Sequence, residues 1–395
     1  MKRLLTGLAL AASAFAAPAM AADPIKIALI HSATGPFEQY ARDTERGLKL
    51  GLEYLTEGKN ELLGRPLEVI TKDDQFKPEL SRALLTEAYA DDKVDIAVGT
   101  SWSGGTIAAM PVAEQFKKVF IAEPAIADSI TGENFNRFTF RVSRNSTQDA
   151  LASVAGLEDG DSVAFLAADY VFGKDGVASF KEAMETMGKK AQVVHEEYLP
   201  TNTTDFTAGM QRVYGKLKDA PGKKYLVVIG GAPNPIPKLA ATRPDRYGIE
   251  MISVGASNLE SMVAWKGLGV VGGTFYFYTF PQNAMNDWLV KEHEARYGQP
   301  PDLFTVGGFN AAAAIVAGIQ KAGTTESEAL ITAMEGLTFD TPKGPITFRA
   351  EDHQGIQDQF QYRMKAKPEG KWDLLELVRT VPAAEMPVPV RVKAD

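Results

Sequence analysis

The sequence contains no cysteine. This absence excludes disulfides, thiol nucleophiles, CxxC redox pairs and every zinc or iron–sulfur site that needs cysteine ligands. Histidine is scarce, with four residues in 395, and no two of them form an HExxH or similar pair, so we expect no metal site. Blocks of positive charge are also missing: Lys+Arg 42 and Asp+Glu 50 give a net charge of -8, which does not suit nucleic acid binding.

The first 21 residues have the pattern of a secretory signal peptide. A basic start precedes an apolar stretch from Leu4 to about Ala17, and Ala19-Met20-Ala21 has the small-x-small pattern of a cleavage site. We predict cleavage near Ala21 and export to the periplasm. No cysteine follows that site to carry a lipid, and we predict no membrane span in the mature chain.

Short apolar runs alternate with stretches of helical period along the mature chain. Strands are predicted at 25–30, 94–99, 162–168 and 224–230, each followed by a helix. Strands that are apolar on both faces predict parallel sheets covered by helices on both sides. Because the rhythm occurs twice, over 24–141 and 144–255, the predicted fold class is α/β with two doubly wound Rossmann-like lobes. We expect the strands after residue 270 to complete these two sheets.

Loops at the carboxyl ends of parallel strands are the candidate binding site, because they lead to helix N-termini with free N–H groups. The loop GTSWSGGT (99–106) combines hydroxyls and glycines, which suits a carboxylate or phosphate, although its serines also fit plain helix capping. Aromatic residues are plentiful on the same loops, although Trp102 and Phe172 also fit packing inside the lobes. The residues predicted here are Phe37, Tyr40, Trp102, Ser103, Gly104, Gly105, Tyr170 and Phe172.

No enzyme motif stands out. The loop at 99–106 approaches the G-x-S-x-G nucleophile elbow, but Ser103 stands where the second glycine belongs. GxGxxG and GxxxxGK[ST] are absent, and the pair Asp73-Asp74 fits a turn with a helix cap better than acid–base chemistry. We predict no catalysis and no cofactor, with an α/β hydrolase as the enzyme alternative.

Several segments together resemble the solute-binding proteins of branched-chain amino acid ABC transporters, of the leucine/isoleucine/valine-binding type. They are IKIALIHSATGPFEQY, GRPLEVITKDDQFKPELS, IAVGTSWSGGT, IAEPA, FRVSRN, DYVFGKDG, TTDFTAGM and GPITF, in an order and spacing that span about residues 25 to 350. The resemblance implies a type I periplasmic binding protein fold, in which a three-crossover hinge joins the lobes near 141–144, 272–276 and 350–354. It divides the chain into a signal peptide (1–21), lobe 1 (22–142 plus 273–352), lobe 2 (143–272 plus 353–380) and an irregular C-terminal tail (381–395).

The resemblance also implies a function. Such proteins close two lobes over a small solute and deliver it to an ABC permease in the inner membrane, and we expect a monomer. Amino acid-binding members hold the carboxylate on the serine-rich loop, at Ser103 here, and the ammonium on an acidic residue of the second lobe. This chain has Ala256 in place of that acid, and Ala232 where an aromatic hydroxyl is common. Further positions that the resemblance places toward the cleft are Ala127, Asn234, Ser257 and Asn258.

The missing acid favours a solute without an amino group. Burying an unpaired ammonium costs several kcal/mol, so a free amino acid would bind poorly unless Glu123 or another acid replaces the lost carboxylate. An aromatic or other organic acid is therefore the predicted solute, and some members of the family bind aromatic acids. A branched-chain or other amino acid receptor and a periplasmic ligand sensor stay open as alternatives.

Overall fold

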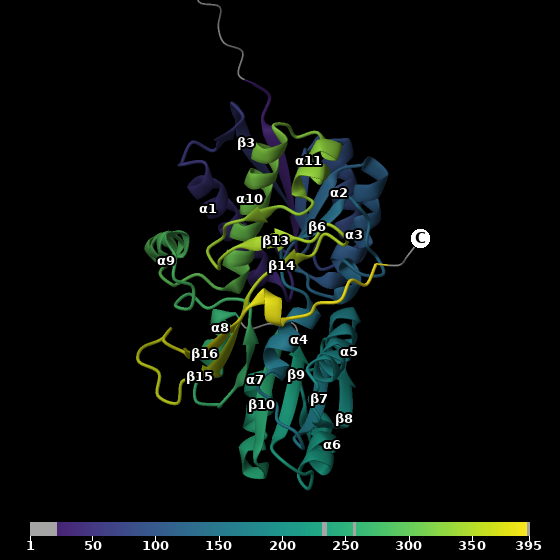
Figure 1. Ribbon diagram of the computed structural model, residues 1–395, viewed down its shortest axis with the longest axis vertical. Coiled ribbons are helices and arrows are strands. Elements are labelled where there is room, and N and C mark those ends of the chain that lie inside the picture. The colour runs from purple at the N-terminus through teal and green to yellow at the C-terminus, as the bar shows by residue number, and fades with distance from the viewer. Residues whose placement is uncertain (1–21, 231–234, 256–257, 393–395) are drawn as a thin grey trace, which may run out of the picture.

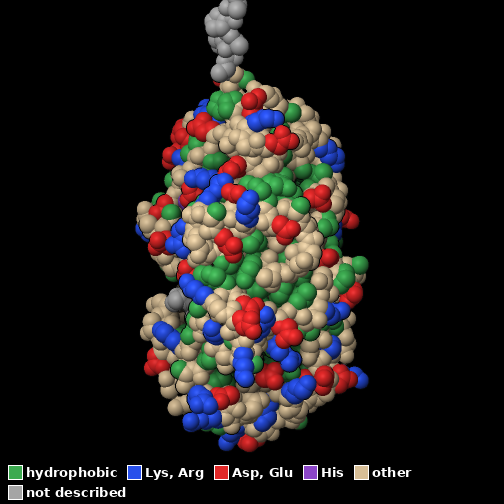
Figure 2. Space-filling view, turned by 90° about the vertical axis from the view of Figure 1, so that its left-hand side faces the viewer, with side chains coloured by type: hydrophobic (Ala, Val, Ile, Leu, Met, Phe, Trp, Pro, Cys, Tyr) green, Lys and Arg blue, Asp and Glu red, His purple; other side chains and the backbone are tan. Residues whose placement is uncertain are grey.

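The computed structural model describes residues 22–230, 235–255 and 258–392, and it contains two α/β lobes, one above the other (Figure 1). The predicted fold class is confirmed. On the face shown in Figure 2, hydrophobic side chains gather toward the middle, where the lobes meet, while charges of both signs are interspersed over the two ends.

The first lobe is built on a six-stranded sheet in the order β2-β3-β1-β4-β5-β6. All its neighbouring strands are parallel except the short pair β2 and β3. The strands are β1 (Ile25–His31), β2 (Glu61–Leu62), β3 (Arg65–Asp73), β4 (Ile96–Gly99), β5 (Val119–Ala122) and β6 (Thr139–Arg141). The helices packed with it are α1 (Glu38–Leu55), α2 (Pro78–Ala90), α3 (Ser103–Phe116), α10 (Leu303–Ala322) and α11 (Ser327–Met334), and α9 (Ala284–Tyr297) lies at its side (Figure 1).

Helices α1 and α10 touch through their backbones, although they lie about 250 residues apart in the sequence. A Cβ on Gly47 would lie 1.8 Å from the carbonyl oxygen of Thr305, and one on Gly308 would lie 2.0 Å from that of Thr44. By length and composition α10 could cross a membrane, but 89% of its apolar window is buried inside the protein. Its hydrophobicity is accounted for by this packing.

The second lobe is built on a seven-stranded sheet in the order β16-β15-β11-β10-β9-β7-β8. Its central strands are parallel, and β15 and β16 are antiparallel additions at one edge. The strands are β7 (Ser162–Ala168), β8 (Gln192–Leu199), β9 (Lys224–Gly230), β10 (Ile249–Gly255), β11 (Val271–Thr274), β15 (Gln359–Met364) and β16 (Leu375–Val381). The helices are α4 (Ser146–Val154), α5 (Val171–Thr186), α6 (Thr207–Leu217), α7 (Ile236–Ala241) and α8 (Leu259–Ala264), with 3-10 turns η1 (Asp128–Ile130), η2 (Pro244–Tyr247) and η3 (Ala383–Glu385) elsewhere in the chain.

The expectation that all late strands complete the two large sheets is wrong. β15 and β16 do extend the second sheet, but a separate three-stranded sheet is formed by β12 (Thr338–Phe339), β13 (Ile346–Phe348) and β14 (Gly355–Ile356). β13 pairs with β12 and β14 on its two sides, and Phe339, Ile346 and Phe348 bury their side chains in the core of the first lobe.

Segments distant in the sequence meet where the lobes join. Arg141, fully buried at the end of β6, donates from Nε to Oε1 of Gln354 at 2.6 Å and from Nη2 to Oγ1 of Thr131 at 2.6 Å. The chain after β16 runs back along this junction (Figure 1), and Arg349 donates to the carbonyl oxygen of Val388 at 2.7 Å. The division of the chain into lobes at 142, 272 and 352 remains a prediction.

Candidate functional site

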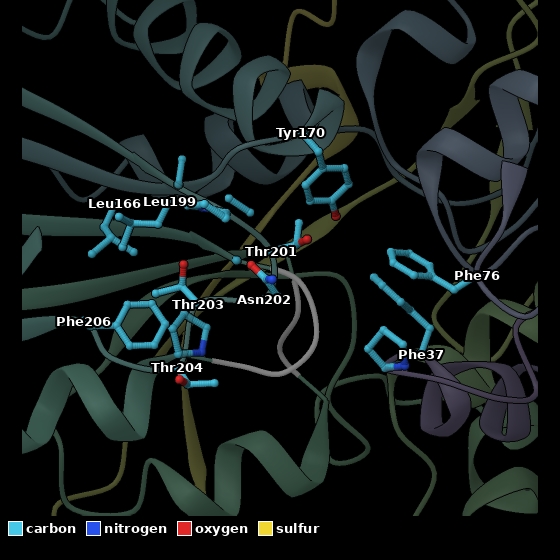
Figure 3. Close-up of a pocket in the computed structure, with 16 residues that line it drawn as sticks. Phe37, Phe76, Leu166, Tyr170, Leu199, Thr201, Asn202, Thr203, Thr204 and Phe206 are labelled. Atoms are coloured by element: carbon cyan, nitrogen blue, oxygen red, sulfur yellow. The ribbon is translucent and has the colours of Figure 1, made fainter.

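Two adjoining cavities lie between the lobes, and Phe37, Tyr170 and Gly230 line both of them. The small cavity has a volume of about 40 Å³ and reaches the loop between β4 and α3. The large cavity has a volume of about 350 Å³ and extends toward the segment that follows β8. Figure 3 shows the large cavity, with Phe37 and Phe76 on one side and the residues of the second lobe on the other.

Two serine hydroxyls in the small cavity are prepared to donate hydrogen bonds. The backbone N–H of Ser32 donates to Oγ of Ser101 at 2.9 Å, and that of Ala127 donates to Oγ of Ser103 at 3.2 Å. Each hydroxyl oxygen thus already accepts a hydrogen bond, and within the described ranges neither hydroxyl has an acceptor for its own proton. Ser103 is also the first residue of α3, where N–H groups lack partners in the helix and the helix dipole favours an anion.

Aromatic rings form much of the remaining wall. The ring of Phe37 stacks on that of Phe76 with centroids 4.9 Å apart, and Phe76 packs against Trp102 at 4.3 Å. Tyr40 stacks on Phe304 at 3.9 Å. These contacts fix the rings before any solute enters, which lowers the entropy cost of binding a flat apolar molecule.

One basic side chain, Arg144, lines the small cavity, and it is not among the site residues predicted from the sequence. It is buried, and its Nε lies 3.2 Å from both carboxylate oxygens of Asp149. Burial raises the pKa of Asp149, and the charge of Arg144 opposes that shift. The segment FRVSRN contains this arginine, but the sequence carries no signal that its side chain reaches the cleft.

The structure brings six of the predicted residues together: Phe37, Tyr40, Trp102, Ser103, Tyr170 and Phe172 all line the small cavity. Phe172 also packs in the core of the second lobe, so both interpretations of this residue describe it. Two residues that the prediction missed, Phe76 and Phe304, complete the aromatic wall. Phe76 follows the end of β3, a position that could have marked it, whereas Phe304 lies in α10 and carries no such signal.

Four other predicted residues do not line either cavity. A Cβ on Gly104 would lie 2.3 Å from the Trp102 ring, and one on Gly105 would lie 2.7 Å from Oγ of Ser81, so both glycines serve close packing at the start of α3. Ala127 is fully buried and holds Ser103 through its N–H. Asn258 is buried as the N-cap of α8, where its side chain accepts from the N–H of Ser261.

The last two predicted residues, Asn234 and Ser257, lie outside the described residues.

No carboxylate is found among the described residues that line the two cavities. The sequence of the two internal segments outside the described residues, 231–234 and 256–257, reads Gly-Ala-Pro-Asn and Ala-Ser. Glu123, considered above as a replacement acid, is 2% exposed and lies against α10, where a Cβ on Gly307 would come within 1.8 Å of its Oε1. Burial raises its pKa to about 8, with Arg144 opposing the shift. Glu123 is therefore largely neutral at pH 7.

We predict that Glu123→Gln stabilises the protein at high pH. The folded protein holds a proton on Glu123 up to about pH 8, whereas the unfolded chain releases it near pH 4.5, so stability is lost as pH rises between these values. An amide cannot ionise, and the variant should gain roughly 4 kcal/mol in unfolding free energy at pH 8 relative to its effect at pH 4. Urea denaturation at both pH values measures this difference. A gain that is equal at both values would contradict the assignment of a neutral buried acid.

Comparison with known proteins finds similar sequences and structures that are named as binding or transporter proteins. The family model described as periplasmic binding protein matches residues 24–370. The leucine-, isoleucine-, valine-, threonine- and alanine-binding protein of Pseudomonas aeruginosa is 27% identical over 92% of this chain and 94% of its own length. A crystal structure from Rhodopseudomonas palustris, described as an ABC-type branched-chain amino acid transporter, is 52% identical, covers 94% of this chain and 100% of its own, and has a TM-score of 0.83. A second R. palustris structure, an ABC transporter solute-binding protein in complex with 3,4-dihydroxybenzoic acid, is 28% identical over 92% of this chain and 99% of its own, with a TM-score of 0.79.

Proposed function

The chain belongs to the periplasmic binding protein family, as a solute-binding protein of ABC transporters, and we propose that its solute is an aromatic acid without an amino group. One observation carries this proposal. Apolar side chains, aromatic rings and hydroxyls line most of the two cavities, Arg144 adds a positive charge to the small one, and no carboxylate among the described lining residues offers a partner to an ammonium group. An amino acid would lose the hydration of its ammonium without a replacement, at a cost of several kcal/mol.

The proposed binding mode follows from the small cavity. The solute carboxylate accepts hydrogen bonds from the hydroxyls of Ser101 and Ser103 and faces the N-terminus of α3. Its ring packs between Phe37 of the first lobe and Tyr170 of the second. Since each lobe supplies part of the site, closure removes water from the ligand, and the ligand stabilises the closed state by the contacts made only there.

The relatives support two solute classes. The relative bound to 3,4-dihydroxybenzoic acid supports an aromatic acid, whereas the P. aeruginosa relative, named for aliphatic amino acids, supports the alternative of an amino acid. The cavity chemistry decides our choice between them. The protein would act as a monomer in the periplasm, hand its solute to an inner-membrane ABC permease, and catalyse no reaction; a sensor role would use the same cleft.

A ligand panel tests the solute class. Protein refolded after removal of bound solute should be stabilised by benzoate and by 4-hydroxybenzoate but not by leucine or valine. The two benzoates have no ammonium group that would lose its hydration on binding. A ligand at about a hundred times its dissociation constant adds roughly 2.7 kcal/mol, which raises the Tm by a few degrees. Benzamide is the matched control for the charge and should give no shift. Stabilisation by leucine alone would reject the aromatic acid and establish the amino acid alternative.

A further inference from the structure

The large cavity has a group of polar side chains that the proposed carboxylate site does not use. Thr201, Asn202, Thr203 and Thr204 follow β8 in the second lobe and line this cavity opposite Phe37 and Phe76 (Figure 3). The rest of its wall in the second lobe is mainly apolar, formed by residues such as Leu166, Leu199 and Phe206. The cavity therefore combines apolar walls with a run of hydrogen-bonding groups on the side of the second lobe.

These polar side chains are available to a ligand. Among the described residues, the side chains of Thr201, Asn202, Thr203 and Thr204 have no hydrogen-bond partner in the protein, while the backbone of the segment is held by the N–H of Thr203 donating to Pro200 and by Nζ of Lys238 donating to Thr204. Three hydroxyls and an amide can both donate and accept hydrogen bonds. They match a neutral polar group better than a second charge.

The volume of the large cavity exceeds the needs of a compact acid. Its volume of about 350 Å³ comes in addition to the small cavity of about 40 Å³ at the serines. A carboxylate on Ser101 and Ser103 with a single ring attached directly to it would leave much of this space to water. Filling it would bury more apolar surface against Leu166, Leu199 and Phe206, which strengthens binding.

We propose that the solute is an elongated aryl carboxylate that passes from the small cavity into the large one and carries a neutral hydrogen-bonding group, such as a hydroxyl, at its far end, bound by the segment Thr201–Thr204. This inference rests on the proposed function, since it takes the carboxylate at Ser103 as its starting point. The chemical class is an arylalkanoate or arylalkenoate with a polar ring substituent.

Titration calorimetry with three acids tests the proposal. Benzoate is compact, 3-phenylpropanoate is longer, and 3-(4-hydroxyphenyl)propanoate is longer and carries a distal hydroxyl. We expect the hydroxylated acid to bind at least about tenfold more tightly than benzoate. The double variant Thr201→Val and Thr203→Val should weaken binding of the hydroxylated acid by about 3- to 10-fold and change that of 3-phenylpropanoate by less than about twofold, because it removes hydroxyls at constant size. Thr186→Val, on the exposed end of α5, is the matched control and should change neither affinity.

The outcomes separate this proposal from the function on which it rests. Tightest binding of benzoate, or an equal loss of affinity for both long acids in the valine variant, would overturn the elongated solute while leaving an aromatic acid receptor. If none of the three acids binds and leucine does, both the proposed function and this inference are wrong. Circular dichroism of the valine variant establishes that it is folded before the affinities are compared.

Discussion

Ser103→Ala is expected to lower the affinity for the aromatic acid by roughly 10- to 100-fold. A hydrogen bond from a hydroxyl to a carboxylate contributes about 1.5–3 kcal/mol in a buried site, and the proton of Ser103 has no other acceptor within the described part of the chain. The loss should appear mainly as faster dissociation, since the diffusional encounter is unchanged. Calorimetry and stopped-flow tryptophan fluorescence, reporting through Trp102, would measure both quantities.

Ser153→Ala is the matched control for this variant. Oγ of Ser153 also accepts from a buried backbone N–H, that of Gly273 at 2.9 Å, but Ser153 lines neither the small nor the large cavity. Both variants leave one buried N–H without an acceptor and should lose about 1–3 kcal/mol of stability. Only Ser103→Ala should lose affinity. If both variants bind with wild-type affinity, the carboxylate does not lie at Ser103.

Gly308→Val is expected to prevent the first lobe from reaching its native packing. A side chain at this position in α10 would enter the space of the Thr44 carbonyl oxygen in α1, 2.0 Å from its Cβ, and backbone atoms cannot rotate away as a side chain can. Separating the two helices would open the core between them. The cost should exceed about 4 kcal/mol, a large part of the 5–15 kcal/mol that stabilises a typical domain. Urea denaturation followed by far-UV circular dichroism would measure it.

Gly215→Ala provides the contrasting case. Gly215 lies inside α6, and apart from its chain neighbours and the backbone of its own helix no atom lies within 4 Å of the position of its Cβ. Alanine there should raise the unfolding free energy by about 0.5–1 kcal/mol, because glycine loses more backbone entropy in a helix. Equal effects of the two substitutions would show that the contact between α1 and α10 does not limit stability.

The fold was predictable because its central strands can be recognised from their own residues alone. β1, β7 and β9 are continuous apolar runs, as strands buried on both faces must be, and helices follow at the expected intervals. The small sheet of β12–β14 was not predictable, since strands of two or three residues carry no periodicity. Whether this sheet forms depends on which apolar surface the other elements of the first lobe leave uncovered.

The candidate site was predictable where its residues follow the ends of parallel strands. Ser103, Trp102 and Tyr170 lie at strand ends, so the fold class alone places them near the cleft. Phe304 reaches the cavity from α10, about 200 residues further along the chain than Trp102, and only tertiary packing brings it there. Arg144 is similar: a charged residue in a connecting segment is expected in solvent, and its burial follows from its partner Asp149.

The order of elements along the chain also bears on how the protein is made. The strands of the first sheet are complete at Arg141, but α10, which packs with α1 in the core beside them, begins only at Leu303, roughly 160 residues later. During synthesis, residues 25–141 therefore expose the apolar surface that α10 later covers. Contacts between segments so far apart in the sequence form slowly. The first lobe can therefore reach its final packing only after about three quarters of the chain has been made.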